Sequence, residues 1–572
     1  MRRCYRKKDG KRHGYWALVE SYRSARGPRQ RVVAYLGEMD AAGRLGIHQQ
    51  AAGVTAVAQR GLFRDVEPQW VEVDLKRVAI ERKRAFGGPW IGLQLCRQVG
   101  LVDFLEQTLP SGREQIPWPV MAQILILARL CDPSSELHIA EHFYAASALS
   151  DLLGVPASKV NEDRLYRVLD QLLPHQEELE KHLQNRLGEL FDLDYDLLLY
   201  DVTSTFFEGA AQRNELAQRG YWRDHRPDCK QVNIAVVVSR AGMPLGYRLF
   251  AGNRNDVTTL QEIVEQIERL YGRANRIWVL DRGMVSEENV RFLQQGRRRY
   301  IVGTPKGMLQ RFARELRAPD WQTVHEGLEV RFCPAPGGEE VFLLCRSAQR
   351  KEKEQAMHQR FERRIEEGLE KIGASCRKRK QLPAAVGLRV GRLLGKNSRA
   401  AGAFEIKIDQ DANGFAQFSW KKIDGWREWA RLSEGCYVLR SNVTDWSPEE
   451  LWRAYMQLTE AETAFRIQKT DLQLRPIWHQ KQERVEAHIL VCFLAFVLWK
   501  TLAQLCQRAG LGNEPRKVFE ELAAITLVDV VLPTRCGVTI RKRCISRPTE
   551  HQAILLQHLG LCLPNSLEIA KM

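Results

Sequence analysis

The sequence predicts a multidomain α+β protein, and three observations support that fold class. The chain has 572 residues, which is too many for one hydrophobic core and indicates three or four domains. Its first 85 residues contain β-rich runs, and residues 88 to 190 carry apolar side chains at helical spacing. From about residue 194 onward, short apolar runs typical of buried strands alternate with amphipathic helices, which indicates a mixed sheet with helices packed against it.

The order of elements after residue 194 is that of a ribonuclease H-like core. Three apolar runs separated by turn residues predict antiparallel strands, and an amphipathic helix follows them. A strand, a helix that begins at Ser286 and a further strand complete the pattern. In order, the segments are DLLLYD, QVNIAVVVS, PLGYRLFAG, NDVTTLQEIVEQIERLYG, RIWVLD, SEENVRFLQQG and RYIVGTP. In this mixed five-stranded arrangement the first and fourth strands are neighbours.

Three acidic residues are notable for their positions in these elements. Asp201 closes the first strand segment and Asp281 closes the fourth, so both are expected at the rim of the sheet. Glu462 lies in a segment with helical periodicity, AYMQLTEAETAFRIQK. The same predicted helix face contains Tyr455, Leu458, Arg466 and Lys469. If the carboxylates converge, they would repel one another unless a divalent cation lay between them, and oxygen ligands suit Mg²⁺ or Mn²⁺.

Each acidic residue also has a simpler interpretation. An aspartate that follows a strand is commonly a turn or helix-capping residue. Glu462 and Arg466 are one helical turn apart, so they could form an ordinary solvated ion pair. The occurrence of all three carboxylates within one element order favours a shared metal site over these separate roles.

Three motifs resemble those of a known family. They are YDVTSTFFEG with Asp201, LDRGMVSEEN with Asp281, and a match to a Tyr-x2-Arg-x3-Glu-x6-Lys signature. In this chain the signature reads Tyr455, Leu458, Glu462 and Lys469, so a leucine stands at the arginine position. Over most of residues 195 to 500 the chain resembles the DDE transposases of bacterial insertion sequences, in the group with a β-rich insertion before the glutamate.

The resemblance implies cut-and-paste DNA transposition, in which insertion-sequence ends are cleaved and joined to target DNA. Asp201, Asp281 and Glu462 would be the catalytic residues and the ligands of two Mg²⁺ or Mn²⁺ ions. DNA phosphates would be contacted by Tyr455, Lys469 and, as a helper, Arg466. The implied partners are double-stranded terminal inverted repeats and target DNA, with a homodimer as the working form. Two alternatives stay open: a nuclease of the same fold that cuts without joining, and an inactive, domesticated DNA-binding protein.

The spacing of the acidic residues predicts a large insertion in the core. Asp281 and Glu462 are 181 residues apart, and the strand-like segments EVRFC, EVFLLCR, FEIKID, FAQFSW and CYVLRSN lie between them, with one charged helix. The predicted domains are a basic β-rich domain (1–85), a helical DNA-end-binding domain (88–190), the first core part (194–305), a β-rich insertion (306–447), the second core part with the Glu462 helix (448–510) and a helical C-terminal region (511–572).

The composition agrees with a DNA partner. The chain has 86 Lys and Arg against 70 Asp and Glu, for a net charge of +16, with basic clusters at RRCYRKKDGKR, QQGRRR, CRKRK and IRKRC. The 13 cysteines include no CxxC pair, and GRLLGKNS lacks the spacing of a nucleotide-binding loop. The longest apolar run, Ile489–Trp499, is too short to span a bilayer. We therefore expect a cytoplasmic, nucleoid-associated bacterial protein with no membrane contact and no nucleotide cofactor.

Overall fold

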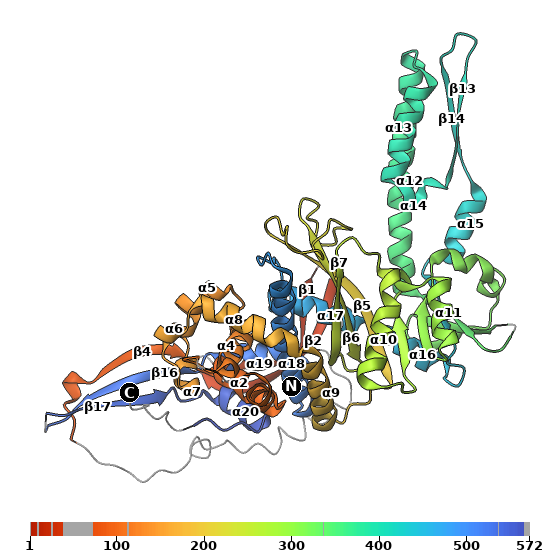
Figure 1. Cartoon of the computed structure of the whole chain (residues 1–572). Helices are drawn as coiled ribbons and strands as arrows, with labels where there is room; N and C mark the ends of the chain where they lie inside the picture. The colour runs from red at the N-terminus through yellow and green to blue at the C-terminus, as the bar shows by residue number, and fades with distance from the viewer. Residues whose placement is uncertain are drawn as a thin grey trace. The chain divides into compact units, whose positions relative to one another are not determined.

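The computed structural model describes residues 2–8, 11–24, 27–37 and 72–564, except residues 111, 113, 336 and 536. The chain forms two compact units (Figure 1). The first contains Met1–Asn255, Glu262–Ala274 and Thr459–Met572, and the second contains Asp256–Gln261 and Asn275–Leu458. Sheets and helices occur in both units, which confirms the predicted α+β class.

The sheet that carries Asp201 lies in the first unit. β5 (Leu197–Phe206) pairs antiparallel with β6 (Gln231–Ser239), which pairs antiparallel with β7 (Pro244–Ala251). The prediction that Asp201 closes its strand is wrong, because β5 continues for five residues beyond it. This continuation, VTSTF, is rich in β-branched residues, pairs with β6 throughout and is buried up to its last residue, so it forms a regular strand despite its hydroxyl groups.

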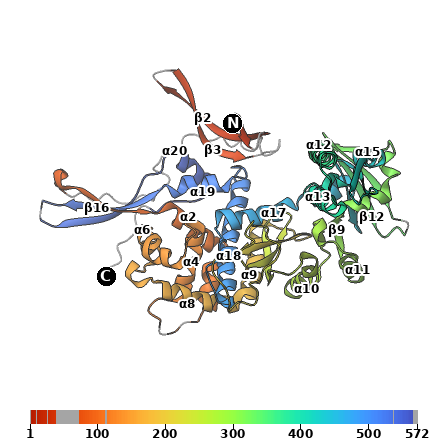
Figure 2. The same ribbon diagram turned by 90° about the horizontal axis from the view of Figure 1, so that it is seen from above.

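Helices make up most of the rest of the first unit. They include α2 (Gly87–Gln98), α3 (Leu101–Thr108), α4 (Trp118–Cys131), α8 (Glu162–Leu172) and α9 (Gln176–Phe191), with short helices α5 (Glu136–His138), α6 (Tyr144–Ala146) and α7 (Leu149–Leu153) between α4 and α8. α18 (Gln482–Arg508) is the long helix against which α2, α4 and α8 pack (Figure 2). By length and composition α18 could cross a membrane, but 89% of its apolar window is buried, as in the core helix of a soluble protein.

The C-terminal region is not entirely helical, contrary to the prediction for residues 511–572. Between α19 (Pro515–Ala523) and α20 (Glu550–His558) lie β16 (Thr526–Pro533) and β17 (Thr539–Ile545). β16 pairs with β17 and with β4 (Ala79–Ala85) in a three-stranded antiparallel sheet. Arg84 helps to hold this sheet, because its buried guanidinium lies 2.6 Å from carboxylate oxygens of both Asp151 and Asp529.

The predicted β-rich domain at 1–85 is therefore divided. β1 (Arg2–Lys8), β2 (Lys11–Ser24) and β3 (Gly27–Gly37) form their own antiparallel sheet, whereas β4 belongs to the sheet of β16 and β17. Residues 38–71 of the predicted domain lie outside the described residues. The sequence showed strand patterns in the first 85 residues, but it did not show which strand pairs with which.

After β7 the elements follow the predicted order. They are α10 (Leu260–Tyr271), β8 (Ile277–Leu280), α11 (Glu287–Gln295) and β9 (Arg299–Gly303). Ser286 caps α11 as expected, since its hydroxyl accepts a hydrogen bond from the N–H of Asn289 at 3.0 Å. β8 and β9 are parallel.

The sheet of the second unit extends well beyond β8 and β9. Its remaining strands are β10 (Gln322–His325), β11 (Leu328–Pro334), β12 (Val341–Ser347) and β15 (Cys436–Ser441), in the order β10-β11-β12-β15-β9-β8. All neighbours except β8 and β9 are antiparallel, so the sheet is mixed. The predicted insertion at 306–447 contributes strands to this sheet, because β15 pairs with β9 at its edge.

The rest of the insertion is an arm in which helix predominates (Figure 1). α12 (Ala348–Lys378) is the charged helix that was predicted, and it packs with α13 (Pro383–Lys396), α14 (Ser398–Ala401) and the hairpin of β13 (Phe404–Gln410) and β14 (Ala416–Lys422). α15 (Asp424–Ser433) leads back to β15. The core of the arm contains Ile365, Leu369, Ile372, Val386, Val390 and Phe404. GRLLGKNS lies mostly within α13, so it is helix rather than a phosphate-binding loop.

Candidate active site

Asp201 lies in the middle of β5 in the first unit. It is half-buried between the buried residues Tyr200 and Val202, and its Oδ1 accepts a hydrogen bond from the N–H of Val202 at 2.8 Å. The backbone of β5 thus holds one carboxylate oxygen, and the side chain stays partly accessible.

Glu462 belongs to the same unit, on α17 (Thr459–Arg466), which packs against β5 and β6. The buried side of α17 consists of Ala461, Ala464 and Phe465, whereas Glu462 and Arg466 are exposed. In the described part of the chain no hydrogen bond or ion pair joins Glu462 to Arg466. The fold therefore brings the elements of Asp201 and Glu462 together, and the simpler interpretation of Glu462 as half of a surface ion pair has no support.

Asp281 lies in the second unit, directly after β8, as predicted. It precedes the short 3-10 turn Arg282–Met284, but its side chain does not cap that turn. Instead, Oδ1 of Asp281 accepts a hydrogen bond from the phenol of Tyr455 at 3.2 Å. A capping role for Asp281 is thereby excluded, and the carboxylate has a partner that orients it.

Tyr455 is held against Asp281 by close packing. Burial, with added effects of the Asp281 charge and hydrogen bond, raises the pKa of Tyr455 far above its usual value, so the phenol stays a proton donor at any physiological pH. A Cβ atom on Gly303 would lie 2.3 Å from the phenol oxygen, so any larger residue at this position on β9 would displace the phenol. Tyr455 was predicted to contact DNA phosphate, and the structure shows it bound to Asp281.

The predicted continuous helix face from Tyr455 to Lys469 is wrong. α16 (Pro448–Met456) ends just after Tyr455, and the N–H of Leu458 bonds to the carbonyl of Tyr455, an interval of three residues that tightens the last turn. α17 then begins anew, and Lys469 lies in a π-helical turn, Ile467–Asp471. The tight turn at Leu458 and the π-helical turn change the rotation from one residue to the next. A regular helical projection, at about 100° per residue, therefore misplaces the side chains of Tyr455 and Lys469.

Lys469 is not free on the surface. Its Nζ lies 3.1 Å from Oδ1 of Asp224, and Arg475 donates to the same oxygen. Asp224 lies in the loop between β5 and β6, and Arg475 follows the π-helical turn. Neither residue was singled out in the sequence, because an aspartate in a charged loop has the composition of a solvated turn.

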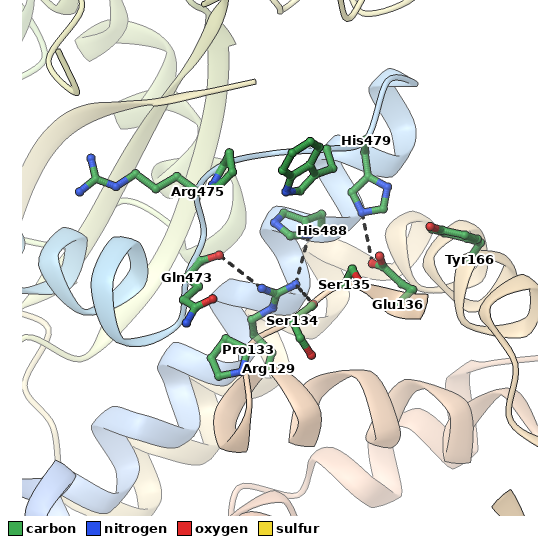
Figure 3. Close-up of a pocket in the computed structure, with 12 residues that line it drawn as sticks. Arg129, Pro133, Ser134, Ser135, Glu136, Tyr166, Gln473, Arg475, His479 and His488 are labelled. Carbon is green, nitrogen blue, oxygen red and sulfur yellow. Dashed lines mark hydrogen bonds and ion pairs between the residues drawn. The ribbon is translucent and has the colours of Figure 1, made fainter. Parts of the chain in front are cut away.

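A second polar cluster occupies a cavity of about 210 Å³ in the first unit (Figure 3). Among the described residues, Glu136, His479 and His488 form a group whose possible metal-ligand atoms lie within 4.8 Å of one another. Arg129 Nη2 lies 3.4 Å from Nδ1 of His488, and His479 Nε2 lies 3.2 Å from Glu136 Oε1. Burial, aided by the charges of Arg129 and His479, lowers the pKa of His488 well below its usual value. The guanidinium of Arg129 already lies beside His488, so the cluster fits an internal hydrogen-bonded anchor better than a cation site.

Asp201, Asp281 and Glu462 each offer carboxylate oxygens, and oxygen donors of this kind suit a hard divalent cation. The family model for the transposase DDE domain matches residues 194–498, more than half of the chain. The model for the N-terminal domain of IS1634 family transposases matches residues 1–60. The chain belongs to the DDE transposase family, so the resemblance seen in its motifs is confirmed and the protein is a DNA transposase. Membership implies use of a divalent metal ion.

Several chains among the solved structures are similar to this one. The chain is similar to the piggyBac transposase in its synaptic complex with hairpin DNA, with 9% sequence identity, a TM-score of 0.37, and coverage of 80% of this chain and 82% of that chain. No curated protein matches the chain significantly.

Proposed function

We propose that the chain catalyses cut-and-paste transposition of an insertion sequence, with Asp201, Asp281 and Glu462 as its catalytic residues. The observation that carries the proposal is the packing of α17 against β5, which supports a common role for Glu462 and Asp201. Asp281 joins them if the core is ribonuclease H-like, because the strands before Asp281 and around Asp201 are neighbours in that fold. The match of the DDE domain across all three positions supports this arrangement.

The donor set suits Mg²⁺ or Mn²⁺, since all three side chains supply carboxylate oxygens. Two such ions, when bound, would activate water or a 3′-hydroxyl and stabilise the leaving oxygen of an in-line displacement at phosphorus. Asp201 is fixed by its strand, Asp281 is oriented by Tyr455, and Glu462 is exposed on a helix that is anchored to β5. The protein then needs no covalent nucleophile of its own.

Contacts with DNA are proposed for the cations next to Glu462. Arg466 is exposed on α17 and could contact a phosphate directly, and Lys469 follows it in the π-helical turn. Tyr455 acts through Asp281. The partners are duplex DNA of the terminal inverted repeats and the target, in a homodimer associated with the nucleoid in the cytoplasm. A role of the helical region at 88–190 in end binding stays a prediction, and α4 is unsuited to reading DNA because nearly all of it is buried.

Cleavage and joining of a terminal-repeat duplex by the purified protein test the proposal. The inverted repeats can be read from the DNA that flanks the gene. Asp201→Asn, Asp281→Asn and Glu462→Gln should each abolish cleavage, and binding measured in Ca²⁺ should change little, because each substitution removes a metal ligand and not a phosphate contact. Full activity in chelator, or near-normal cutting by one variant, would contradict the assignment.

Two further outcomes would identify the alternatives. Cleavage of ends without transfer to target DNA would indicate a nuclease of the same fold. Specific end binding without cleavage in either metal would indicate a domesticated DNA-binding protein. Arg466→Ala is expected to weaken end binding while leaving the metal requirement unchanged, since Arg466 has no role in holding the carboxylates.

A further inference from the structure

A buried carboxylate in the loop between β5 and β6 is held by two cations that follow the Glu462 helix. Asp224 Oδ1 lies 3.1 Å from Lys469 Nζ and also accepts a hydrogen bond from Nη1 of Arg475. The side chains of Asp224 and Lys469 are 9% and 10% exposed, whereas that of Arg475 is 34% exposed. The pair of cations is therefore accessible to solvent chiefly from the Arg475 side.

More than one cation lies near the Asp224 carboxylate. Burial lowers the pKa of Lys469, the neighbouring Asp224 charge opposes that effect, and Arg475 and Arg223 lower the pKa further. Two cations, Lys469 and Arg475, thus share one oxygen of the Asp224 carboxylate. The second oxygen of that carboxylate, Asp224 Oδ2, is buried and has no hydrogen-bond partner among the described residues. Asp224 therefore leaves part of its acceptor capacity unused.

Backbone contacts place this cluster beside the strand of Asp201. Nη1 of Arg223 donates to the carbonyl oxygen of Val202 at 2.7 Å, one residue beyond Asp201. Ile477, two residues after Arg475, is tied to the end of β5 by backbone hydrogen bonds of 2.9 and 3.0 Å. The loop and the segment after α17 are thus both anchored on β5, and the two cations have fixed positions relative to that strand.

We propose that Lys469 and Arg475 form a phosphate-binding cradle for the end of a DNA strand, and that Asp224 occupies this cradle with its carboxylate when DNA is absent. The inference rests on the proposed function. A guanidinium presents a fork of N–H donors that matches phosphate oxygens, and an ammonium adds a compact charge. A phosphate has more acceptor oxygens than Asp224 uses, so it satisfies the two cations more completely. End binding then requires exchange of carboxylate for phosphate, and Asp224 lowers the affinity for DNA ends.

The experiment compares Asp224→Asn with wild type in the full-length protein. Binding of a fluorescent terminal-repeat duplex is measured by anisotropy in Ca²⁺, which permits binding with little cleavage. Asp224→Asn should bind the ends several-fold more tightly, because the asparagine no longer competes as an anion. Asp228→Asn is the control, since it makes the same charge change in the same loop at an exposed carboxylate paired with Arg226. Its affinity should change less than twofold.

A double-mutant cycle decides whether the effect passes through the cradle. The gain from Asp224→Asn should disappear when Arg475→Gln is also present, because the cation that Asp224 releases is then missing. If Asp224→Asn binds no more tightly than wild type, or if Asp228→Asn gives the same gain, the proposal is overturned. A gain that persists with Arg475→Gln overturns it as well.

A second measurement applies if thermal melting shows that Asp224→Asn does not fold. Arg475→Gln alone should weaken end binding by about tenfold, the loss expected for one charge-assisted hydrogen bond to phosphate. Wild-type affinity in that variant would overturn the cradle. The outcome is separable from the proposed function: wild-type protein that neither prefers terminal-repeat DNA nor cleaves it with Mg²⁺ or Mn²⁺ refutes the function, whereas normal cleavage with no effect of Asp224→Asn refutes the cradle alone.

Discussion

Removal of the Tyr455 phenol tests how Asp281 is held for catalysis. In Tyr455→Phe the ring and its packing remain, but Asp281 Oδ1 loses the hydrogen bond donated at 3.2 Å. Hydrogen bonds to charged groups contribute about 1.5–3 kcal/mol, and a distance at the long end of the normal range favours the lower value. About 1.5 kcal/mol corresponds to roughly a tenfold change in an equilibrium constant.

The assay is cleavage of a terminal-repeat duplex as a function of Mn²⁺ or Mg²⁺ concentration. The half-saturating metal concentration should rise about tenfold in Tyr455→Phe, in line with the 10–100-fold cost of losing a group that orients a metal ligand. Duplex affinity in Ca²⁺ should stay within about twofold of wild type, since the phenol is engaged with Asp281. Because burial raises the pKa of Tyr455, the defect should be the same at about pH 7 and about pH 9.

Gly303→Ala provides an independent route to the same defect. The added Cβ would lie 2.3 Å from the Tyr455 phenol oxygen and should displace it from Asp281. The double variant should then be little worse than either single one. Tyr437→Phe is the matched control, because Tyr437 is half-buried like Tyr455 and its phenol accepts a hydrogen bond from Trp452 at 2.8 Å. A wild-type metal requirement in Tyr455→Phe, or an equal shift in Tyr437→Phe, would refute the reasoning.

Three further predictions concern stability. Burial raises the pKa of Glu180 to about 8. The stabilising contribution of this residue is therefore complete below its usual pKa of 4.5 and is lost as the pH rises through 8. Glu180→Gln should flatten this loss of stability in denaturant titrations between about pH 5 and about pH 9. Arg84→Ala should lower the free energy of unfolding by about 1.5–3 kcal/mol, measured by chemical denaturation, because it removes one of the two guanidiniums, Arg84 and Arg543, that pair with Asp151 and Asp529. Gly252→Ala should lower the melting temperature by several degrees, since its Cβ would lie 2.0 Å from the carbonyl oxygen of Gln231.

The sequence was most informative where structure depends on neighbouring residues. The apolar run before Asp281 predicted β8 and its end, because the change from apolar to polar residues coincides with the last paired residue. The same reasoning failed at Asp201, where Thr and Ser continue β5 as buried residues. The prediction of one helix face from Tyr455 to Lys469 failed as well. A tight turn and a π-helical turn leave the spacing of apolar residues nearly unchanged, but they rotate the side chains away from a common face.

The sequence by itself therefore determined the order of elements, the family and the three acidic candidates. The tertiary structure alone decided the partners of the side chains: Asp224 meets Lys469 across 245 residues, and Tyr455 meets Asp281 across 174. It also decided that β4, which contains Arg84, pairs with β16, which contains Asp529. The physical reason is that apolar periodicity records how a segment is buried along its own axis, whereas the meeting of two polar groups depends on how all the elements pack at once.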